Sequence, residues 1–414
     1  MDNIVVVGTG EYGINLLGPT LAMLTREGRT EVIATVDVNE RPETPHYTTE
    51  HMIRSPEQSL SALLAKLRER DPVVILGHSN ELHTPDTLDL VAAGYRVLTE
   101  KPFATSLDEL AQLQKCIDEN PGKVALPEYY LMMKSAPVLI VAGLINPLSF
   151  YKDKTGVIET LGPSALGWGP IHGKLEEMIG KPMAVHVEVL EGEKKQGGTG
   201  RVDHRGHHLV DMRKGGGMIH DLGVHAVSIV CALESYLGKP DTELSSGIVR
   251  VARCQEYIDM ATSKHKIPLE HIGESYAEID METSTGIPVY VKVGKYVLDN
   301  KNQRRFIIIG DRGILHHDLS ACTLSVIQGD NNRGNLLRAP KLPDSKYYPV
   351  IRASLELISQ EHQYDGSPPF VGFDATKASL DAQALVLHAL NKAYNGRTDV
   401  KTYASASATP KDIF

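Results

Sequence analysis

The chain has 414 residues, of which 42% are hydrophobic and 23% are charged, and its formal net charge is −9. This length exceeds the usual domain size of roughly 100–200 residues, so we expect two or three domains. The acidic balance and the absence of a basic run argue against a surface that binds nucleic acid or anionic membranes. A small molecule is the expected partner.

The four cysteines lie far apart in the sequence, at Cys116, Cys231, Cys254 and Cys322. No C-x-x-C spacing occurs, which fits reduced thiols in a cytosolic protein better than disulfides or a zinc site. No stretch approaches the roughly 20 apolar residues of a membrane span, and the N-terminus enters a strand pattern without the features of a signal peptide. The expected location is therefore the cytoplasm, with no membrane partner.

The first third of the chain alternates between strand and helix patterns. Apolar runs predict strands at residues 4–7, 31–37, 72–80 and 95–104. Segments that begin with the capping residues Ser55, Thr84 and Ser106 predict helices at 55–70, 84–94 and 106–119. Because such alternation is typical of a parallel, doubly wound sheet, residues 1–126 are predicted to form a Rossmann-type α/β domain. Pro19 falls inside the expected first helix and should kink it or delay its start.

A G-x-G-x-x-G motif at Gly8, Gly10 and Gly13 follows the first strand directly. With Asp37 at the end of the next strand, it has the arrangement needed to hold a pyrophosphate at a helix N-terminus, although a purely structural turn is the alternative. Asp37 would accept hydrogen bonds from the adenosine ribose and repel a 2′-phosphate, which favours NAD over NADP. Arg41, four residues further on, could reverse that preference.

The pattern changes after about residue 127. A strand with period-two alternation at 181–193 precedes a helix, and six further strand patterns then follow one another without intervening helices. This order predicts an α+β domain with a largely antiparallel sheet over residues 127–400. The final helix, at about 374–394, could pack on either domain, and residues 401–414 are expected to be an exposed tail.

The stretch "GGGMIHDLGVH" at 215–225 sets Asp221 and His225 four residues apart, on one face of a helix. An imidazole can take the hydroxyl proton while a secondary alcohol gives its hydride to a nicotinamide. The three glycines would let the helix begin close to a substrate. A histidine on a helix is, by default, more often a surface or core residue than a catalytic one. The catalytic interpretation of this pair therefore depends on the other motifs.

A second cluster packs His204, His207, His208 and Asp211 into the Gly-rich stretch 197–217. Their spacing matches no standard zinc pattern, so no metal site is expected. The stretch could instead be a loop that covers the substrate, with arginines that meet an anionic or hydroxyl-rich ligand. A solvated insertion is nearly as good an interpretation, and the role of 197–214 stays open.

Four motifs occur in the order and approximate spacing of one protein family: "GTGEYG" at 8–13, "HSNELH" at 78–83, "TEKPFA" at 99–104 and "GGGMIHDLGVH" at 215–225. The chain resembles the glucose–fructose oxidoreductase, inositol dehydrogenase and rhizopine catabolism protein family, Gfo/Idh/MocA. The resemblance implies an NAD(P)-dependent dehydrogenase or reductase of sugars, cyclitols and related polyols.

The same resemblance implies a catalytic set of Lys101, Asp221 and His225. His225 would be the base, Lys101 would donate to the reacting oxygen, and Asp221 would bind a neighbouring hydroxyl or tune His225. The Lys101–Pro102 peptide is commonly cis in the family. The implied cofactor-binding residues are Gly8, Gly10, Glu11, Tyr12, Gly13, Asp37, Asn80, His83, Glu100 and Lys101.

The chain departs from the family where many members carry an arginine, because it reads "LPEYYLMMK" at 126–134. Tyr129 and Tyr130 are therefore expected to contact the substrate, and the identity of the polyol stays open. Three classes are kept apart: a net dehydrogenase, an enzyme that uses tightly bound NAD for transient oxidation (epimerase, lyase or glycosidase type), and a non-catalytic NAD-binding regulator. Family likeness implies a homodimer or homotetramer.

Overall fold

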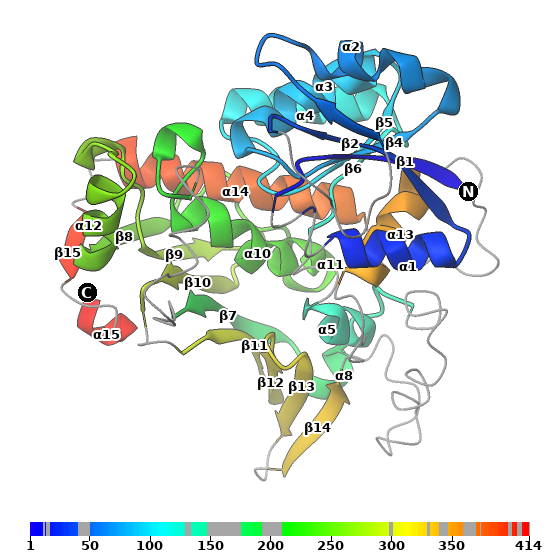
Figure 1. Ribbon diagram of the computed structural model, residues 1–414. Coiled ribbons are helices and arrows are strands. Elements are labelled where there is room, and N and C mark those ends of the chain that lie inside the picture. The colour runs from blue at the N-terminus through cyan, green and yellow to red at the C-terminus, as the bar shows by residue number, and fades with distance from the viewer. Residues whose placement is uncertain are drawn as a thin grey trace. The chain divides into compact units, whose positions relative to one another are not determined.

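The computed structural model describes residues 1–10, 13, 17–39, 50–128, 134–146, 175–192, 209–297, 301–328, 332–338, 347–358, 370–372, 374–395, 400–403 and 408–413. Contacts divide the chain into two compact units. The first unit contains the described residues of 1–128 and 347–358, and the second contains those of 134–338 and 370–413. Figure 1 shows the elements of both units in chain order by colour.

The first unit is built on a six-stranded parallel sheet in the order β3-β2-β1-β4-β5-β6. Its strands are β1 (Asp2–Val7), β2 (Thr30–Asp37), β3 (Glu50–Ile53), β4 (Val73–Leu76), β5 (Arg96–Thr99) and β6 (Val124–Ala125). Strand β4 is buried along its whole length, as expected when helices cover both faces of a parallel sheet. The predicted Rossmann-type fold is confirmed.

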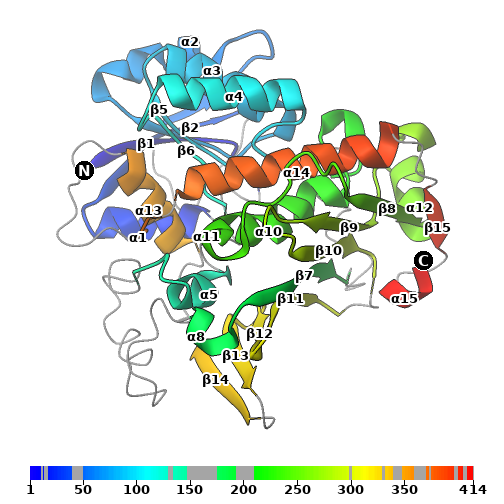
Figure 2. The ribbon, with the colours of Figure 1, turned by 180° about the vertical axis from the view of Figure 1, so that it is seen from behind.

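Helices flank this sheet on both faces (Figure 2). They are α1 (Gly18–Arg26), α2 (Leu60–Leu64), α3 (His83–Ala92), α4 (Leu107–Glu119) and α13 (Tyr348–Ile358), with 3₁₀ turns at Ala65–Arg70 and Asn80–Leu82. Helix α1 has Pro19 in its first turn, where proline is tolerated because that N–H has no helical partner. The α-helical geometry begins at Gly18, and the described residues Gly13 and Leu17 before it have π-helical geometry.

The capping predictions were correct at one helix and wrong at two. Ser106 accepts a hydrogen bond from the third N–H of α4 at 3.2 Å, as predicted. Ser59, and not Ser55, caps α2, so that helix begins later than expected. Thr84 caps nothing, because its hydroxyl donates instead to the carbonyl of Phe103 at 2.8 Å.

Helix α13 belongs to the first unit although it lies more than 200 residues further along the chain. Its Tyr348, Ile351 and Leu355 join the apolar cluster of the Rossmann sheet, and the Tyr348 hydroxyl donates to Glu27 at 2.5 Å. The assignment of all residues 127–400 to the second domain is therefore corrected for 347–358. The reason is burial, because the apolar side of α13 covers β5, β6 and α1.

The second unit contains a nine-stranded sheet in the order β14-β13-β12-β11-β7-β10-β9-β8-β15. Its strands are β7 (Pro182–Glu191), β8 (Ile248–Cys254), β9 (Tyr276–Glu282), β10 (Pro288–Lys295), β11 (Gln303–Gly310), β12 (Gly313–Asp318), β13 (Thr323–Gln328), β14 (Asn332–Arg338) and β15 (Lys401–Tyr403). Only β7 with β10 and β8 with β15 pair in parallel. The predicted largely antiparallel sheet is confirmed.

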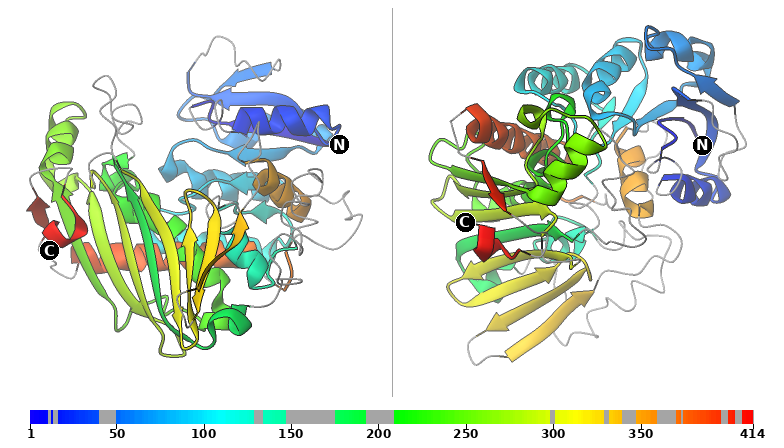
Figure 3. Two further views of the ribbon diagram at one scale, coloured as in Figure 1. Left: turned by 90° about the horizontal axis from the view of Figure 1, so that it is seen from below. Right: turned by 60° about the vertical axis from the view of Figure 1, so that its left-hand side comes forward.

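Two long helices, α10 (Met218–Ala232) and α14 (Ala375–Asn395), lie together on one face of this sheet (Figure 3). The final helix thus packs in the second unit. The shorter helices of the unit are α5 (Ala136–Val141), α8 (Leu175–Ile179), α11 (Glu234–Leu237), α12 (Gln255–Ser263) and α15 (Pro410–Ile413). No helix among the residues listed at the start of this section has both the length and the apolarity to cross a membrane.

The tail is exposed at Lys401 and Thr402, as expected, but the expectation was wrong for Tyr403. Lys401–Tyr403 adds the edge strand β15 to β8. Tyr403 is buried, and its hydroxyl lies 2.9 Å from that of Ser275. Backbone pairing and this buried contact hold the segment against the sheet, because an unpaired sheet edge and a lone buried hydroxyl would both cost free energy.

Candidate active site

Gly8, Gly10 and Gly13 of the glycine motif follow β1. A Cβ atom on Gly8, which has φ +88°, would lie 2.7 Å from the carbonyl oxygen of Gly77, and one on Gly13 would lie 2.2 Å from that of Gly8. Both positions therefore need glycine for the protein's own packing. A Cβ on Gly10 would meet no atom within 4 Å, so the surrounding protein does not require glycine there. This open approach to the backbone fits a pyrophosphate at Gly10.

Asp37 lies beside this motif at the carboxyl end of β2. Its Oδ2 accepts hydrogen bonds from the backbone N–H and the hydroxyl of Thr9, at 2.8 and 2.7 Å. Its Oδ1 accepts from the N–H groups of Val38 and Asn39. The carboxylate is thus held at the end of β2, and Thr9 is a neighbour that the motif did not reveal.

Lys101 follows β5 in a loop whose Lys101–Pro102 peptide is cis, as the resemblance implied. The Glu100 carboxylate is buried and accepts a hydrogen bond from the Lys101 N–H at 3.2 Å. The Nδ1–H of His83, at the start of α3, donates to the carbonyl of Pro102 at 2.8 Å. Burial lowers the pKa of His83 to about 3, so this imidazole is neutral. His83 therefore supports the Lys101 loop through its backbone.

His83 is also part of a network that the sequence analysis missed. Its ring stacks on that of His78, with the centroids 5.3 Å apart. His78 contacts Asp86 through Nε2 at 2.7 Å, and Arg54 donates two hydrogen bonds to the same carboxylate, one of them at 2.8 Å. Burial alone would raise the pKa of Asp86, but His78 and Arg54 outweigh it and the pKa is lowered. Asn80 lies between the two histidines in the sequence, at the start of a 3₁₀ turn.

In the second unit, α10 carries Asp221 and His225 one turn apart on the same face. Both residues are buried, with about 8% of each exposed. The N-cap residue of α10 is Gly217, which has φ +104° and has no side chain to cap the helix. The carboxylate of Glu274 takes that role, because it accepts a hydrogen bond from the N–H of Ile219 at 2.6 Å.

Glu274 also explains one of the three glycines before α10. A Cβ on Gly217 would lie 2.8 Å from the Glu274 carboxylate. From the sequence, these glycines are expected to leave space for a substrate. The structure gives a different reason for Gly217, which is the close approach of a buried carboxylate to the helix N-terminus together with a positive φ.

Asp221 has a partner that the sequence analysis did not anticipate. The Lys295 ammonium, on β10, donates to Asp221 Oδ2 at 2.6 Å, and only 2% of Lys295 is exposed. Lys295 also lies 3.7 Å from Glu191 on β7, which forms an ion pair with Arg304 on β11. No local pattern in the sequence joins these residues, since Lys295 is 74 positions from Asp221.

The implied catalytic set is divided between the two units, with Lys101 in the first and Asp221 and His225 in the second. Several other predicted residues lie outside the described ones: Glu11, Tyr12, Arg41, Tyr129, Tyr130, His204, His207 and His208. Asp211 is described, and its carboxylate accepts three hydrogen bonds from Arg213. Within the described ranges, no group of three or more His, Cys, Asp or Glu side chains could hold a metal ion.

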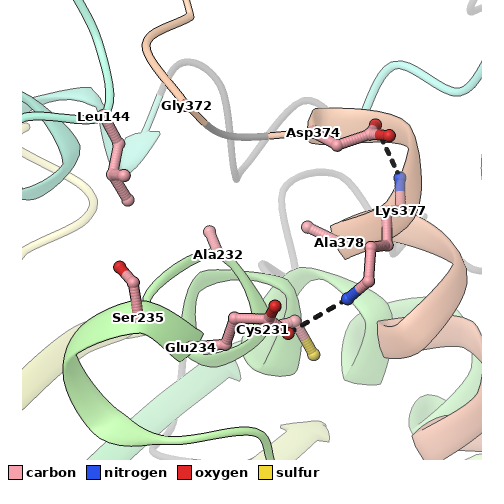
Figure 4. A pocket seen from close by; sticks show the side chains of 9 residues that line it. All are labelled: Leu144, Cys231, Ala232, Glu234, Ser235, Gly372, Asp374, Lys377 and Ala378. Carbon is pink, nitrogen blue, oxygen red and sulfur yellow. Dashed lines mark hydrogen bonds and ion pairs between the residues drawn. The ribbon is translucent and has the colours of Figure 1, made fainter.

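A small pocket in the second unit lies away from these residues (Figure 4). It is lined by the last turn of α10 at Cys231 and Ala232 and by the first turn of α14, where Lys377 forms an ion pair with Glu234. Cys231 follows Asp221 by ten positions in α10, which corresponds to about 15 Å along the helix. The pocket therefore contributes nothing to the candidate active site.

A comparison with protein families decides the class of the first unit. Residues 3–127 match the family described as "Oxidoreductase family, NAD-binding Rossmann fold", GFO_IDH_MocA. The first unit is therefore an NAD-binding Rossmann domain of the Gfo/Idh/MocA type. The resemblance seen in the sequence is confirmed, and the dinucleotide is the group that the glycine motif and Asp37 fit. When bound, it would supply a nicotinamide that exchanges hydride.

Solved structures of similar fold cover almost the whole chain. A 3-ketoreductase from Actinomadura kijaniata, in complex with NADP and TDP-benzene, is 18% identical with a TM-score of 0.61, over 97% of this chain and 99% of that one. GenD2 from gentamicin A biosynthesis, in complex with NAD, is 17% identical with a TM-score of 0.60, over 96% and 95% of the two chains.

A third structure is that of a UDP-N-acetylglucosamine 3-dehydrogenase from Acidithiobacillus ferrooxidans. It is 15% identical with a TM-score of 0.55, over 95% of this chain and 98% of that one. At these identities the likeness concerns the fold. A sequence comparison with curated proteins finds no match.

Proposed function

We propose that this protein is an NAD(P)-dependent dehydrogenase or reductase that acts on a CH–OH or keto group of a sugar, cyclitol or related polyol derivative. The observation that carries the proposal is the Asp221 and His225 pair, buried on one face of a helix whose N-terminus is capped by a remote carboxylate. Two fold relatives support the substrate class by their names, a 3-ketoreductase and a UDP-N-acetylglucosamine 3-dehydrogenase.

In the proposed reaction, His225 accepts the hydroxyl proton of the substrate, and a nicotinamide, when bound, would supply the hydride chemistry at the carbon. Lys101 donates a hydrogen bond to the same oxygen and stabilises the developing alkoxide. In the reverse direction, these two side chains polarise and protonate the ketone. Asp221 accepts a hydrogen bond from a neighbouring substrate hydroxyl or from the His225 ring. Bound nicotinamide supplies the hydride acceptor and donor.

We propose NAD as the preferred cofactor, with NADP as the alternative. A carboxylate at the end of β2 accepts hydrogen bonds from ribose hydroxyls and repels a 2′-phosphate. The anchoring of Asp37 by Thr9 supports this role, because it keeps the carboxylate beside the glycine motif.

The decisive experiment is a screen of sugars, cyclitols, sugar nucleotides and their phosphates or carboxylates with NAD and with NADP, followed at 340 nm. A net dehydrogenase changes the absorbance with at least one polyol. If the purified protein instead carries NAD and converts a polyol without added cofactor, it uses transient oxidation, as an epimerase, lyase or glycosidase would. Cofactor binding without turnover of any compound would favour a regulator.

We further propose that copies of this chain associate through the face of the nine-stranded sheet opposite to α10 and α14. Ile309, Ile314 and Ile327 lie directly across from one another on β11, β12 and β13, and each is only partly buried. On the same face, Tyr290 stacks on His186 and is 38% exposed. A partly exposed apolar row of this kind is typical of an interface.

Light scattering after size exclusion tests this association. The expected mass is that of two or four chains, and Ile314→Arg should lower it, because an uncompensated charge would enter the interface. A wild-type protein that is monomeric at micromolar concentration would contradict the proposal.

A further inference from the structure

A row of alternating charges lies beneath the helix that carries the proposed base. It runs from Arg304 to Glu191, then to Lys295 and to Asp221, and each member contacts the next. Glu191 and Lys295 lie directly opposite each other on the parallel strands β7 and β10. The four residues contribute two positive and two negative charges.

Burial makes this arrangement costly unless each charge has a partner. Lys295 is 2% exposed and Asp221 8%, and an isolated charge in such a place would be strongly disfavoured. Burial alone would raise the pKa of Glu191, but the cations of Lys295 and Arg304 outweigh it, so this pKa is lowered and Glu191 stays ionised. Apolar side chains could fill the same space without that cost, so the row calls for a functional explanation.

We propose that Lys295 is a positioning residue for the reaction: it keeps Asp221 ionised and in one orientation on the face of α10 that carries His225. Glu191, which is itself paired with Arg304, holds Lys295 in place. This inference rests on the proposed function of Asp221 and His225. The contact that carries it is the 2.6 Å charge-assisted hydrogen bond from the Lys295 ammonium to Asp221 Oδ2.

Lys295 determines whether the Asp221 carboxyl group only accepts hydrogen bonds or can also donate one. An ionised carboxylate only accepts hydrogen bonds, whereas a protonated one can also donate. An acceptor matches a substrate hydroxyl or an imidazole N–H, as the proposed reaction needs. Without Lys295, burial would favour the protonated form of Asp221, which would then present a donor.

Charged and titratable groups approach this pair from several elements. Glu191 and Arg304 come from β7 and β11, and His225 lies one turn along α10 itself. Tyr257, on α12, interacts electrostatically with Asp221, but burial raises the pKa of its hydroxyl so far that the ring stays neutral. Lys295 is therefore the cation that directly contacts Asp221 in the described part of the unit.

The first test compares Lys295→Met with Lys295→Arg. Lys295→Met should lower kcat by about 10–10²-fold, because a small displacement of a catalytic group has an effect of this size. It should also move the acidic limb of the kcat profile to higher pH. Lys295→Arg keeps the positive charge, so it should restore at least part of kcat and of the wild-type pH profile.

Lys377→Met is a matched control. Lys377 also bridges two carboxylates, those of Glu234 at 3.0 Å and Asp381 at 2.7 Å, but 49% of its side chain is exposed and it lies on α14. This variant should leave kcat and its pH profile unchanged. If Lys295→Met and Lys377→Met change kcat and its pH profile equally, Lys295 has no specific role.

A double-variant cycle separates positioning from a purely structural role. If Lys295 acts through Asp221, Lys295→Met should change kcat less than about threefold in an Asp221→Asn background, because coupled residues are not additive. A full additional loss in that background would overturn the proposal. Should Lys295→Met fail to fold, Lys295→Met combined with Glu191→Gln removes one charge of each sign and takes its place.

A measurement without substrate distinguishes failure of this inference from failure of the proposed function. Protein labelled with ¹³C at the aspartate carboxyls gives an Asp221 signal that is assigned by its loss in Asp221→Asn. In the wild type this signal should stay in the ionised position from pH 5 to pH 8, and in Lys295→Met it should move to the protonated position within that range. An ionised Asp221 in both proteins would overturn the role of Lys295, whatever the substrate screen finds.

Discussion

The carboxylate of Glu274 accepts a hydrogen bond from the backbone N–H of Ile219, at 2.6 Å, in the first turn of the helix that carries Asp221 and His225. The hydroxyl of Tyr394 donates to the other carboxylate oxygen. Burial raises the pKa of Glu274 above its usual value. Glu274, which is 55 positions from Ile219 in the sequence, thus caps a helix that has no local side-chain cap.

We predict that Glu274→Ala lowers the free energy of unfolding by about 1–3 kcal/mol, because it leaves buried donors without an acceptor. Glu274→Gln keeps an acceptor oxygen and should cost much less. Since the folded pKa is raised, the charged form of Glu274 opposes folding, and the advantage of glutamine should grow as the pH rises above 4.5. Urea unfolding of the three proteins at two pH values checks this. Equal losses for both variants would show that Glu274 does not act as an acceptor.

The glycine motif predicts opposite outcomes for two similar substitutions. Gly10→Ala should fold with wild-type stability, because its Cβ meets no protein atom within 4 Å, but it should weaken NAD(P) binding by obstructing the pyrophosphate. Gly8→Ala should destabilise the fold, since its Cβ would lie 2.7 Å from a backbone oxygen at a positive φ. Thermal unfolding and calorimetric titration with NAD and NADP measure the two effects. Undiminished cofactor affinity in Gly10→Ala would place the pyrophosphate elsewhere.

Cofactor preference should depend on Asp37 and, more weakly, on its anchor. Asp37→Ala should weaken NAD relative to NADP, because the ribose acceptor and the charge that repels a 2′-phosphate are both lost. Thr9→Val removes only the 2.7 Å hydroxyl contact and should give a smaller change in the same direction. The ratio of the two dissociation constants is the relevant measurement. If that ratio is the same in Asp37→Ala and the wild type, Asp37 serves only to hold the glycine motif.

The buried imidazole of His83 predicts a pH dependence of stability. Its pKa is lowered from 6.5 to about 3, chiefly by burial, so between these values the unfolded chain binds a proton that the folded chain does not. Folding stability from this group is therefore complete above pH 6.5 and is lost towards pH 3, by up to about 1.4 kcal/mol per pH unit. His83→Asn should remove that slope from unfolding curves measured between pH 4 and pH 6.5. His388→Asn, on α14, is the control and should keep the pH dependence of stability.

The proposed chemistry predicts that His225→Ala and Lys101→Ala each lower turnover by about 10²–10⁴-fold while NAD(P) binding is nearly retained. The reason is that both side chains act on the reacting oxygen and its proton. Steady-state rates on the best polyol from the screen, together with a cofactor titration, provide the check. A loss below tenfold in both variants would remove these residues from the mechanism.

The sequence determined those features that depend on short stretches of chain. The Rossmann sheet follows from alternating apolar runs and helices, and the nucleotide-binding motif from glycines that must stand directly after β1. Asp221 and His225 share a face because helical periodicity places residues four apart together. Ser106 was recognised as a cap because its partner is three residues away.

Only the tertiary structure decided the contacts between residues that are distant in sequence. Lys295 contacts Asp221 across 74 positions, and Glu274 caps α10 across 55. Helix α13 belongs to the first unit although segments of the second unit precede and follow it in the sequence. A buried ion pair or a remote cap has no periodicity, since one lysine or glutamate within a strand resembles any other. What selects it is the cost of leaving a buried charge or N–H without a partner, and that cost arises only when the chain has folded.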